Sequence, residues 1–154
     1  MADSLVFLTE PDAERRKAIL AVLHRLPGVS VSPFDSIAMM RRAMRSRKPR
    51  LVIGPWAQGG ETLLAARGAA TGTADPAGLP LALVLTDRIS PSRISLARQA
   101  GNADLIPCEP FDEEAFSNRV TLLLQGMDAL CGTVDDEVRA ALENLPALRR
   151  RLAA

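Results

Sequence analysis

The segment Leu51-Val52-Ile53-Gly54-Pro55-Trp56 decides the fold expected for this chain. Three branched apolar residues in a row, stopped by Gly-Pro, indicate a short strand that is buried on both faces of a sheet. In open α/β sheets, functional sites form beyond the carboxyl ends of the strands. Residues 54–58 place glycine, proline and tryptophan there, but no acid, base or nucleophile. We therefore expect no catalytic chemistry at the end of this strand.

Strands and helices alternate along most of the chain. Expected strands cover residues 5–8, 29–32, 51–53, 81–85 and 104–107, and expected helices cover residues 13–26, 36–47, 61–67, 92–100 and 112–130. Residues 68–80 are rich in Gly, Ala, Thr and Pro, and we expect a long mobile loop there. Five alternating strand–helix units predict an α/β fold with a doubly wound, five-stranded parallel sheet that helices cover on both faces.

Length and composition suit one globular domain, because 154 residues that are 47% hydrophobic can bury a core. The net charge of +1 gives no overall field that would attract nucleic acid or a membrane. Cys108 and Cys131 have neither metal-ligand spacing nor a disulfide pattern, which fits a reducing cytosol. The sequence lacks a signal-peptide pattern and an apolar run of membrane-spanning length. We expect a cytoplasmic protein without membrane insertion, bound metal or cofactor.

One further amphipathic helix is expected after Gly132. It divides the chain into a domain of residues 1–131 and a helical extension of residues 132–154, with a kink near Pro146. A lone helix of this length is marginal, so its apolar stripe should pack on this domain, on a second copy or on a partner, and these alternatives stay open. The stripe contains Val134, Val138, Ala141, Leu142, Leu145, Leu148 and Leu152.

Two groups of arginines are candidates for binding anions. They are Arg41, Arg42 and Arg45 on the expected helix 36–47, and Arg149, Arg150 and Arg151 near the end of the chain. A solvated helix face explains the first group most simply, and cations near a helix C-terminus also favour the helix dipole. A nucleotide remains an alternative ligand, whereas nucleic acid is disfavoured because no aromatic residues are interleaved with the arginines.

Four motifs, in this order and spacing, resemble the receiver domain of two-component response regulators over roughly residues 4–130. They are Glu10-Pro11-Asp12, Lys48-Pro49-Arg50-Leu51-Val52-Ile53, Leu83-Val84-Leu85-Thr86, and Ala97-Arg98-Gln99-Ala100-Gly101-Asn102-Ala103-Asp104 leading to Pro110-Phe111. The resemblance implies a flavodoxin-like strand order of 2-1-3-4-5. It also implies that Pro110 follows a cis peptide bond.

The resemblance places a phosphorylation pocket on residues that lack its chemistry. In the family, two acids after the first strand and an aspartate ending the third hold magnesium, and that aspartate accepts the phosphoryl group. A Thr or Ser ends the fourth strand, and a lysine before Pro-Phe contacts the phosphoryl oxygens. Here the acids fall on Leu8 and Thr9, next to Glu10, and the acceptor falls on Pro55. The hydroxyl falls on Thr86, and the lysine on Cys108 or Glu109.

These replacements predict a degenerate pseudo-receiver that is not an enzyme. Leucine offers magnesium no side-chain ligand, proline has no nucleophile, and Glu109 would repel a phosphoryl oxygen. Asp87 and Glu109 could form an acid–base pair, but no nucleophile accompanies them. We expect a phosphorylation-independent regulatory or adaptor protein of bacterial signalling that acts by protein–protein contact. The alternative is a sensor that binds an anionic nucleotide or another small ligand through its arginines.

The expected partner surface follows from the resemblance and from the C-terminal stripe. Receiver domains signal largely through their fourth helix, fifth strand and fifth helix, which implies a partner-binding role for Ile94, Ile106 and Pro107. Trp56 either plugs the old pocket or lies exposed as a contact anchor, since tryptophan is enriched at interface hot spots. The extension adds Val138, Leu142, Leu145 and Leu148, through which the chain would bind a signalling protein or a second copy of itself.

Overall fold

The computed structural model describes residues 3–71 and 79–125. The chain divides into two compact units, Met1–Val120 and Thr121–Ala154, and only the first five residues of the second unit belong to the described part. The predicted helical extension and its boundary at residue 132 lie outside the described residues, and so do residues 72–78 of the predicted loop.

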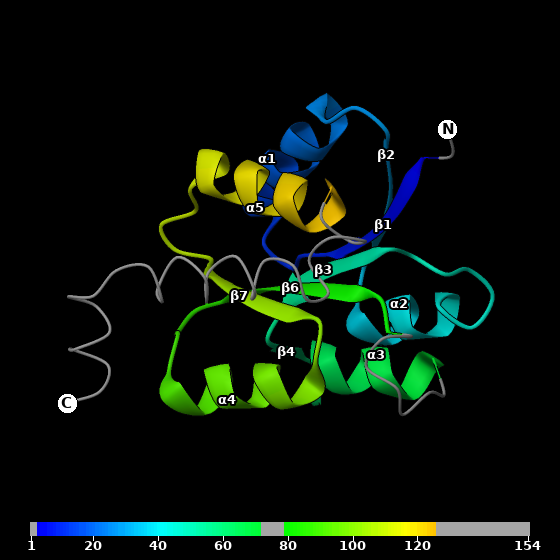
Figure 1. The fold of residues 1–154 in the computed structure, drawn as a ribbon, viewed down its shortest axis with the longest axis vertical. Coiled ribbons are helices and arrows are strands. Elements are labelled where there is room, and N and C mark those ends of the chain that lie inside the picture. Colours follow the sequence, from blue (N-terminus) through cyan, green and yellow to red (C-terminus); the bar gives the residue numbers. More distant parts are fainter. Residues whose placement is uncertain (1–2, 72–78, 126–154) are drawn as a thin grey trace, which may run out of the picture. The chain divides into compact units, whose positions relative to one another are not determined.

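Five parallel strands form the central sheet of the first unit (Figure 1). They are β1 (Ser4–Thr9), β2 (Val29–Phe34), β3 (Leu51–Pro55), β6 (Leu81–Thr86) and β7 (Ala103–Pro107). Their order is β2-β1-β3-β6-β7, with Phe7 opposite Val52 and Ile53 opposite Leu83. The predicted five-stranded parallel sheet and its 2-1-3-4-5 order are confirmed.

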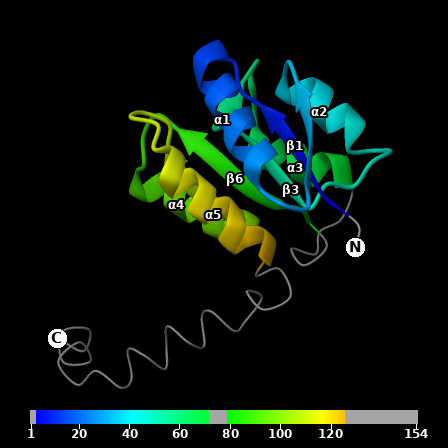
Figure 2. The same ribbon diagram turned by 90° about the horizontal axis from the view of Figure 1, so that it is seen from above.

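Helices cover both faces of the sheet, as the doubly wound topology requires. They are α1 (Ala13–Arg25), α2 (Ile37–Ala43), α3 (Leu63–Thr71), α4 (Pro91–Ala100) and α5 (Glu113–Gln125). In Figure 1, α1 and residues 113–120 of α5 lie on one face, and α2, α3 and α4 lie on the other. Figure 2 shows α1 and this part of α5 beside each other in front of the strands.

The core consists of the inner strands and the inward residues of the helices. Residues 6–8, 51–53 and 82–85 are almost completely buried, as strands enclosed on both faces should be. Ile19, Val22 and Leu23 of α1, Ile37 and Met40 of α2, and Phe116 and Val120 of α5 complete it. Ala115, the neighbour of Phe116 in α5, is exposed.

Two predicted boundaries on the α2–α3 side of the sheet are wrong. Helix α2 ends at Ala43 rather than Arg47, because the N–H groups of Arg45 and Ser46 donate to carbonyls three residues back and form turns instead of continuing the helix. The expected helix 61–67 begins later, at Leu63. A short antiparallel hairpin precedes it, with β4 (Ala57–Gln58) paired to β5 (Glu61–Thr62). Gly59 and Gly60 both have positive φ, which this tight turn requires.

Helix α3 also extends further than predicted, to Thr71. Its start is favoured by Thr62, whose Oγ1 accepts a hydrogen bond from the Ala65 backbone N–H at 3.2 Å, as a capping hydroxyl does. The alanines that suggested a loop are good helix formers. Residues 68–71, the first part of the predicted loop, are therefore helical.

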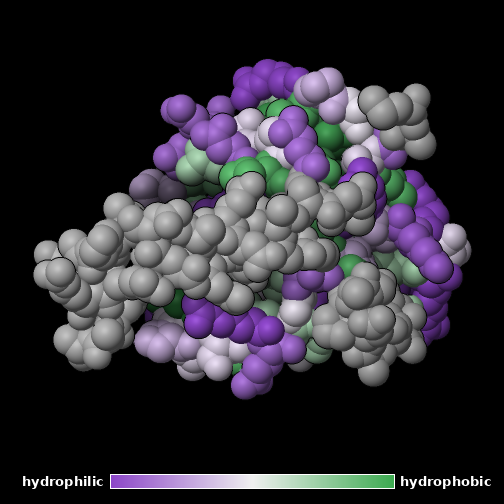
Figure 3. All heavy atoms as spheres, in the orientation of Figure 1, coloured by the Kyte–Doolittle hydropathy of each residue, from purple (hydrophilic) through white to green (hydrophobic). Residues whose placement is uncertain are grey.

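On the face shown in Figure 3, hydrophilic residues surround smaller areas of hydrophobic residues. Within the first unit, the large apolar side chains that are exposed are Met39, Ile89, Ile94 and Leu96. In residues 3–71 and 79–125, no helix has the length and apolar character needed to span a membrane.

Candidate functional site

A pocket of about 310 Å³ lies at the carboxyl edge of the sheet, where β1, β3, β6 and β7 end. This is the edge at which open α/β sheets bind their ligands. The residues that line the pocket are Glu10, Pro11, Arg15, Pro55, Trp56, Ala57, Leu85, Asp87, Arg93 and Cys108. It therefore lies where the phosphorylation pocket was predicted.

The predicted pocket residues are only partly brought together. Glu10, Pro55 and Cys108 line the pocket. Leu8 and Thr9 do not line it, because both belong to β1 and are completely buried in the sheet. The carboxylate that β1 contributes to this edge is that of Glu10, the first residue after the strand.

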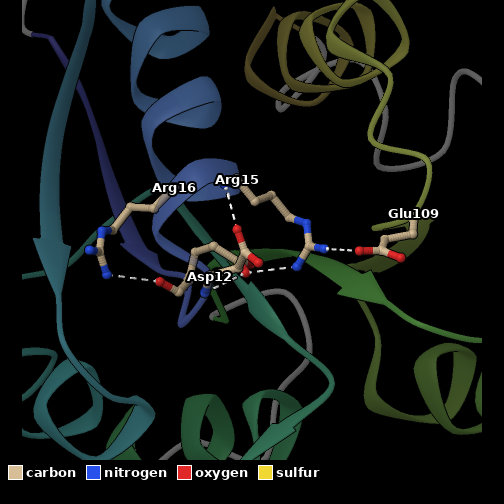
Figure 4. Close-up of polar contacts among 5 residues, drawn as sticks. Asp12, Arg15, Arg16 and Glu109 are labelled. Atoms are coloured by element: carbon tan, nitrogen blue, oxygen red, sulfur yellow. Dashed lines mark hydrogen bonds and ion pairs between the residues drawn. The ribbon is translucent and has the colours of Figure 1, made fainter.

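Arg15 projects from the first turn of α1 and joins two carboxylates. Asp12 caps this helix and accepts a hydrogen bond from the Arg15 backbone N–H at 2.8 Å (Figure 4). The Arg15 guanidinium lies 2.9 Å from Glu10 Oε1 through Nη1 and 3.0 Å from Glu109 Oε1 through Nη2. These two acids differ sharply in environment, because the Glu10 side chain is 2% exposed and that of Glu109 is 79% exposed.

The Glu10 carboxylate is the buried acid of this site. Its Oε1 also accepts from the Asp12 backbone N–H, and the Glu10 carbonyl accepts from Arg16 Nη1 at 3.1 Å. Burial by itself lowers the pKa of Arg15, but the charge and hydrogen bond of Glu10 outweigh it and the pKa of Arg15 is raised. Arg15 therefore stays cationic and neutralises Glu10.

Arg93 reaches the same pocket from the first turn of α4. Ser90 caps this helix, and Pro91 is its first residue, where the missing N–H costs nothing. Arg93 Nη1 lies 2.5 Å from Thr86 Oγ1 and 2.7 Å from Asp87 Oδ1. The hydrogen bond from Arg93 lowers the pKa of Asp87.

Thr86, the predicted strand-end hydroxyl, makes three hydrogen bonds. It accepts from Arg93 and from the Arg88 backbone N–H, and it donates to the Arg88 carbonyl at 2.7 Å. Its side chain is buried within this turn. The hydroxyl is therefore held by the protein's own groups.

Trp56 combines features of the two roles predicted for it. It is half-buried and packs against the apolar core on the α2–α3 side, as a plug would. The Arg93 guanidinium lies 4.8 Å from the centre of its ring, within the range of a cation–π interaction. Trp56 thus forms a wall of the pocket and holds Arg93 over it.

Cys108 and Glu109 follow β7 beside Arg15. Burial raises the pKa of the Cys108 thiol, which keeps it protonated and weakly nucleophilic at neutral pH. The Glu109–Pro110 peptide bond is cis, as predicted for Pro110. Both residues also line a wider, more open pocket between α1 and the segment 108–113. The described residues include no group of three or more His, Cys, Asp or Glu side chains that could hold a metal ion.

The other predicted binding residues lie away from this pocket. Arg41 pairs with Glu61 of the hairpin at 3.1 Å, whereas Arg42 and Arg45 are exposed. Ile94 and Pro107 are exposed and Ile106 is half-buried. Val138, Leu142, Leu145, Leu148 and Arg149–Arg151 lie outside the described residues.

Sequence reasoning did not identify the two arginines of the pocket. Arg15 and Arg93 each occupy the third position of a helix that follows a strand of the sheet, three residues after the capping Asp12 or Ser90. A capping box normally has Glu or Gln at this position, which lies beside the strand ends. An arginine at this position in two helices was the feature of the sequence that could have identified the pocket residues.

Comparison with known proteins concerns the fold. No protein-family model and no curated protein matches the chain. A response regulator receiver protein from Pseudomonas putida is 18% identical, with a TM-score of 0.64, and the match covers 79% of this chain and 98% of that one. A LuxR-family two-component response regulator from an Aurantimonas species is 17% identical, with a TM-score of 0.68 and coverage of 89% and 99%.

A third solved structure is the signal receiver domain of an HD domain-containing protein from Pseudomonas fluorescens. It is 13% identical, with a TM-score of 0.68, and the match covers 84% of this chain and 92% of that one. Such identities establish a shared fold and nothing finer. The fold of this chain is that of the receiver domains of two-component response regulators.

Proposed function

We propose that this chain is a phosphorylation-independent regulatory protein of two-component signalling, which acts in the cytoplasm by binding a protein partner. The observation that carries the proposal is the composition of the pocket at the carboxyl edge of the sheet. Pro55 ends β3 where the family has its acceptor, and the guanidinium of Arg15 lies against the one buried carboxylate, Glu10. Pro55 has no nucleophile to accept a phosphoryl group, and Glu10 is paired with Arg15 rather than free to hold magnesium.

The electrostatics of the pocket support the same proposal. A magnesium ion needs carboxylate oxygens that are free to coordinate it. Glu10 already neutralises Arg15, and a divalent cation beside this guanidinium would be repelled. Thr86 is engaged by Arg93 and by the Arg88 backbone, so its hydroxyl is not free to follow a phosphoryl group. Glu10 and Thr86 are therefore both engaged by arginine side chains.

The exposed apolar residues near α4 support a function through contacts. Ile89, Ile94 and Leu96 are 36–49% exposed, within eight positions of the chain. Pro107 at the end of β7 is also exposed, so exposed apolar side chains are available for contacts on α4, before it and at the end of β7. The predicted stripe of residues 134–152 would add a second contact, to a signalling partner or to a second copy of the chain.

Treatment with acetyl phosphate and magnesium is expected to add no phosphoryl group to this protein. Proline has no nucleophile, and the cation of Arg15 opposes magnesium. Intact-mass spectrometry is the measurement, with an authentic receiver domain as the positive control in the same reaction. An adduct that hydroxylamine removes would contradict the proposal, because hydroxylamine cleaves acyl phosphates.

Substituting the apolar surface near α4 is expected to weaken partner capture. The full-length Ile94→Asp/Leu96→Asp and Leu142→Asp/Leu145→Asp variants are compared with wild type as baits in a native lysate, read by mass spectrometry. Burying an unpaired carboxylate at an interface should reduce capture at least about tenfold. Met39→Asp is the control, since Met39 is about as exposed as Leu96 but lies on α2. Equal capture by all four proteins would contradict a contact through either surface.

A further inference from the structure

We propose that the pocket between Arg15 and Arg93 binds a small phosphate dianion without covalent bonding. This inference goes beyond the proposed function, because it makes the pocket a binding site for a diffusible anion. The anion would be inorganic phosphate or a small phosphomonoester. The argument rests on two guanidinium groups that line one cavity of about 310 Å³, at the lower end of the usual size of ligand pockets.

The first support is the unused hydrogen-bonding capacity of Arg93. All three of its side-chain hydrogen bonds leave from Nη1, to Thr86, Asp87 and the Arg88 carbonyl. Within residues 3–71 and 79–125, Nη2 and Nε of Arg93 have no such partner. A guanidinium carries five N–H donors in a planar fork that matches phosphate oxygens. Arg93 is therefore oriented by one nitrogen and keeps the others for a ligand.

The second support is the exposure of the carboxylates that now balance these cations. Asp87 on Arg93 is 77% exposed and Glu109 on Arg15 is 79% exposed, whereas Glu10 is buried. Exposed ion pairs contribute little, so Asp87 and Glu109 can turn into water at small cost. Glu10 stays paired with Arg15. One dianion then replaces the two charges of Asp87 and Glu109, so the total charge around the two guanidinium groups is unchanged.

The third support is the position of the two cations in their helices. Arg15 and Arg93 stand in the first turn of α1 and α4, where the helix dipole disfavours positive charge. A negative group beside each guanidinium offsets this unfavourable interaction with the helix dipole. A phosphate group offers three acceptor oxygens around one centre, and it can accept from two guanidinium groups that face the same cavity.

Fluorescence of Trp56 reports on the pocket, because it is the only tryptophan of the chain and Arg93 lies over its ring. The full-length protein is titrated with sodium phosphate, and sodium chloride keeps the ionic strength constant. A saturable fluorescence change is expected, with the same midpoint by calorimetry. A second titration with glycerol phosphate distinguishes the two possible ligands. If glycerol phosphate binds more tightly than inorganic phosphate, the natural ligand is a phosphomonoester, and if it binds more weakly, the ligand is inorganic phosphate.

Variants distinguish a built site from general charge attraction. Arg93→Gln should weaken binding at least about tenfold by calorimetry, because it removes charge-assisted hydrogen bonds. Arg98→Gln changes the net charge equally but lies exposed at the other end of α4, and it should bind as wild type does. Asp87→Asn and Glu109→Gln remove the competing carboxylates, and each should tighten binding several-fold.

Three results would overturn the inference. They are the absence of saturable phosphate binding, equal weakening by Arg98→Gln and Arg93→Gln, and tighter binding of succinate than of either phosphate. The proposed function fails by a different result, a phosphoryl adduct in the intact-mass experiment, so the failures of the two ideas can be told apart.

Discussion

Arg67→Met is expected to lower the free energy of unfolding by about 3 kcal/mol, because it removes a buried charged donor from four backbone carbonyls. Urea denaturation followed by circular dichroism measures the change. Methionine keeps most of the aliphatic stem, so the loss reports on the guanidinium rather than on a cavity. This variant should be among the most destabilising single substitutions in the chain.

The reason is the way Arg67 ties α3 to the end of α4. Its side chain is completely buried. Nη1 donates to the carbonyls of Pro80 and Asn102 at 2.9 and 3.0 Å, and Nη2 donates to those of Gly101 and Ala100 at 2.7 and 3.3 Å. Burial lowers the pKa of Arg67 to about 10, which leaves it charged at neutral pH.

Two variants sharpen the prediction for Arg67. Arg67→Lys keeps the charge but concentrates its donors on one nitrogen, so it cannot serve four carbonyls and should cost about half as much. Arg98→Met removes an exposed arginine of α4 and should change stability by no more than about 0.5 kcal/mol. Equal stability of Arg67→Met and Arg98→Met would contradict the role of Arg67 as a tie between these elements.

The strands and the parallel sheet could be predicted because they depend on patterns that are local in the sequence, whereas the strand order was implied by the resemblance to receiver domains. Runs such as residues 51–53 and 81–85 are apolar without alternation, which occurs when a strand is covered on both faces. The right-handed crossover rule then limits the topologies. The hairpin before α3 escaped prediction because its strands are two residues long, too short for any periodicity to appear.

The contents of the pocket could be predicted only in part. The absence of an acceptor at Pro55 is visible from identity alone, since no environment gives proline a nucleophile. The roles of Arg15, Arg93 and Arg67 depend on contacts with residues up to 94 positions away, as between Arg15 and Glu109. In the sequence these arginines are three among many, and only the fold separates a buried tie from a solvated charge.

The arginines that the sequence suggested for anion binding are not those that line a pocket in the structure. The group on α2 attracted attention because Arg41, Arg42 and Arg45 are close in sequence, yet Arg41 is used to hold the hairpin through Glu61. The pair that lines a cavity is separated by 78 positions and is assembled by two helix N-termini at one sheet edge. Proximity to a cavity, rather than density of charge, identifies the candidate anion site.

Arg15→Leu is expected to lower the free energy of unfolding by about 3 kcal/mol, because it leaves the buried Glu10 carboxylate without its counter-charge. Glu109→Gln, which removes the exposed partner of the same guanidinium, should cost no more than about 0.5 kcal/mol. Urea unfolding of both variants at neutral pH gives the comparison. Similar losses for the two would show that Arg15 is not needed to balance Glu10.

A double-mutant cycle isolates this ion pair from the packing of Arg15. Arg15→Leu leaves the buried Glu10 carboxylate unpaired, and adding Glu10→Gln removes that charge. The double variant should therefore be about 2 kcal/mol more stable than Arg15→Leu alone. Glutamine can still accept from the Asp12 backbone N–H, which keeps the start of α1 in place. If the losses of Arg15→Leu and Glu10→Gln were simply additive, the pocket would not be held by this pair. A positive coupling would mean that the cation at the carboxyl edge of the sheet is an integral part of the fold, where a receiver domain would bind an exchangeable metal ion.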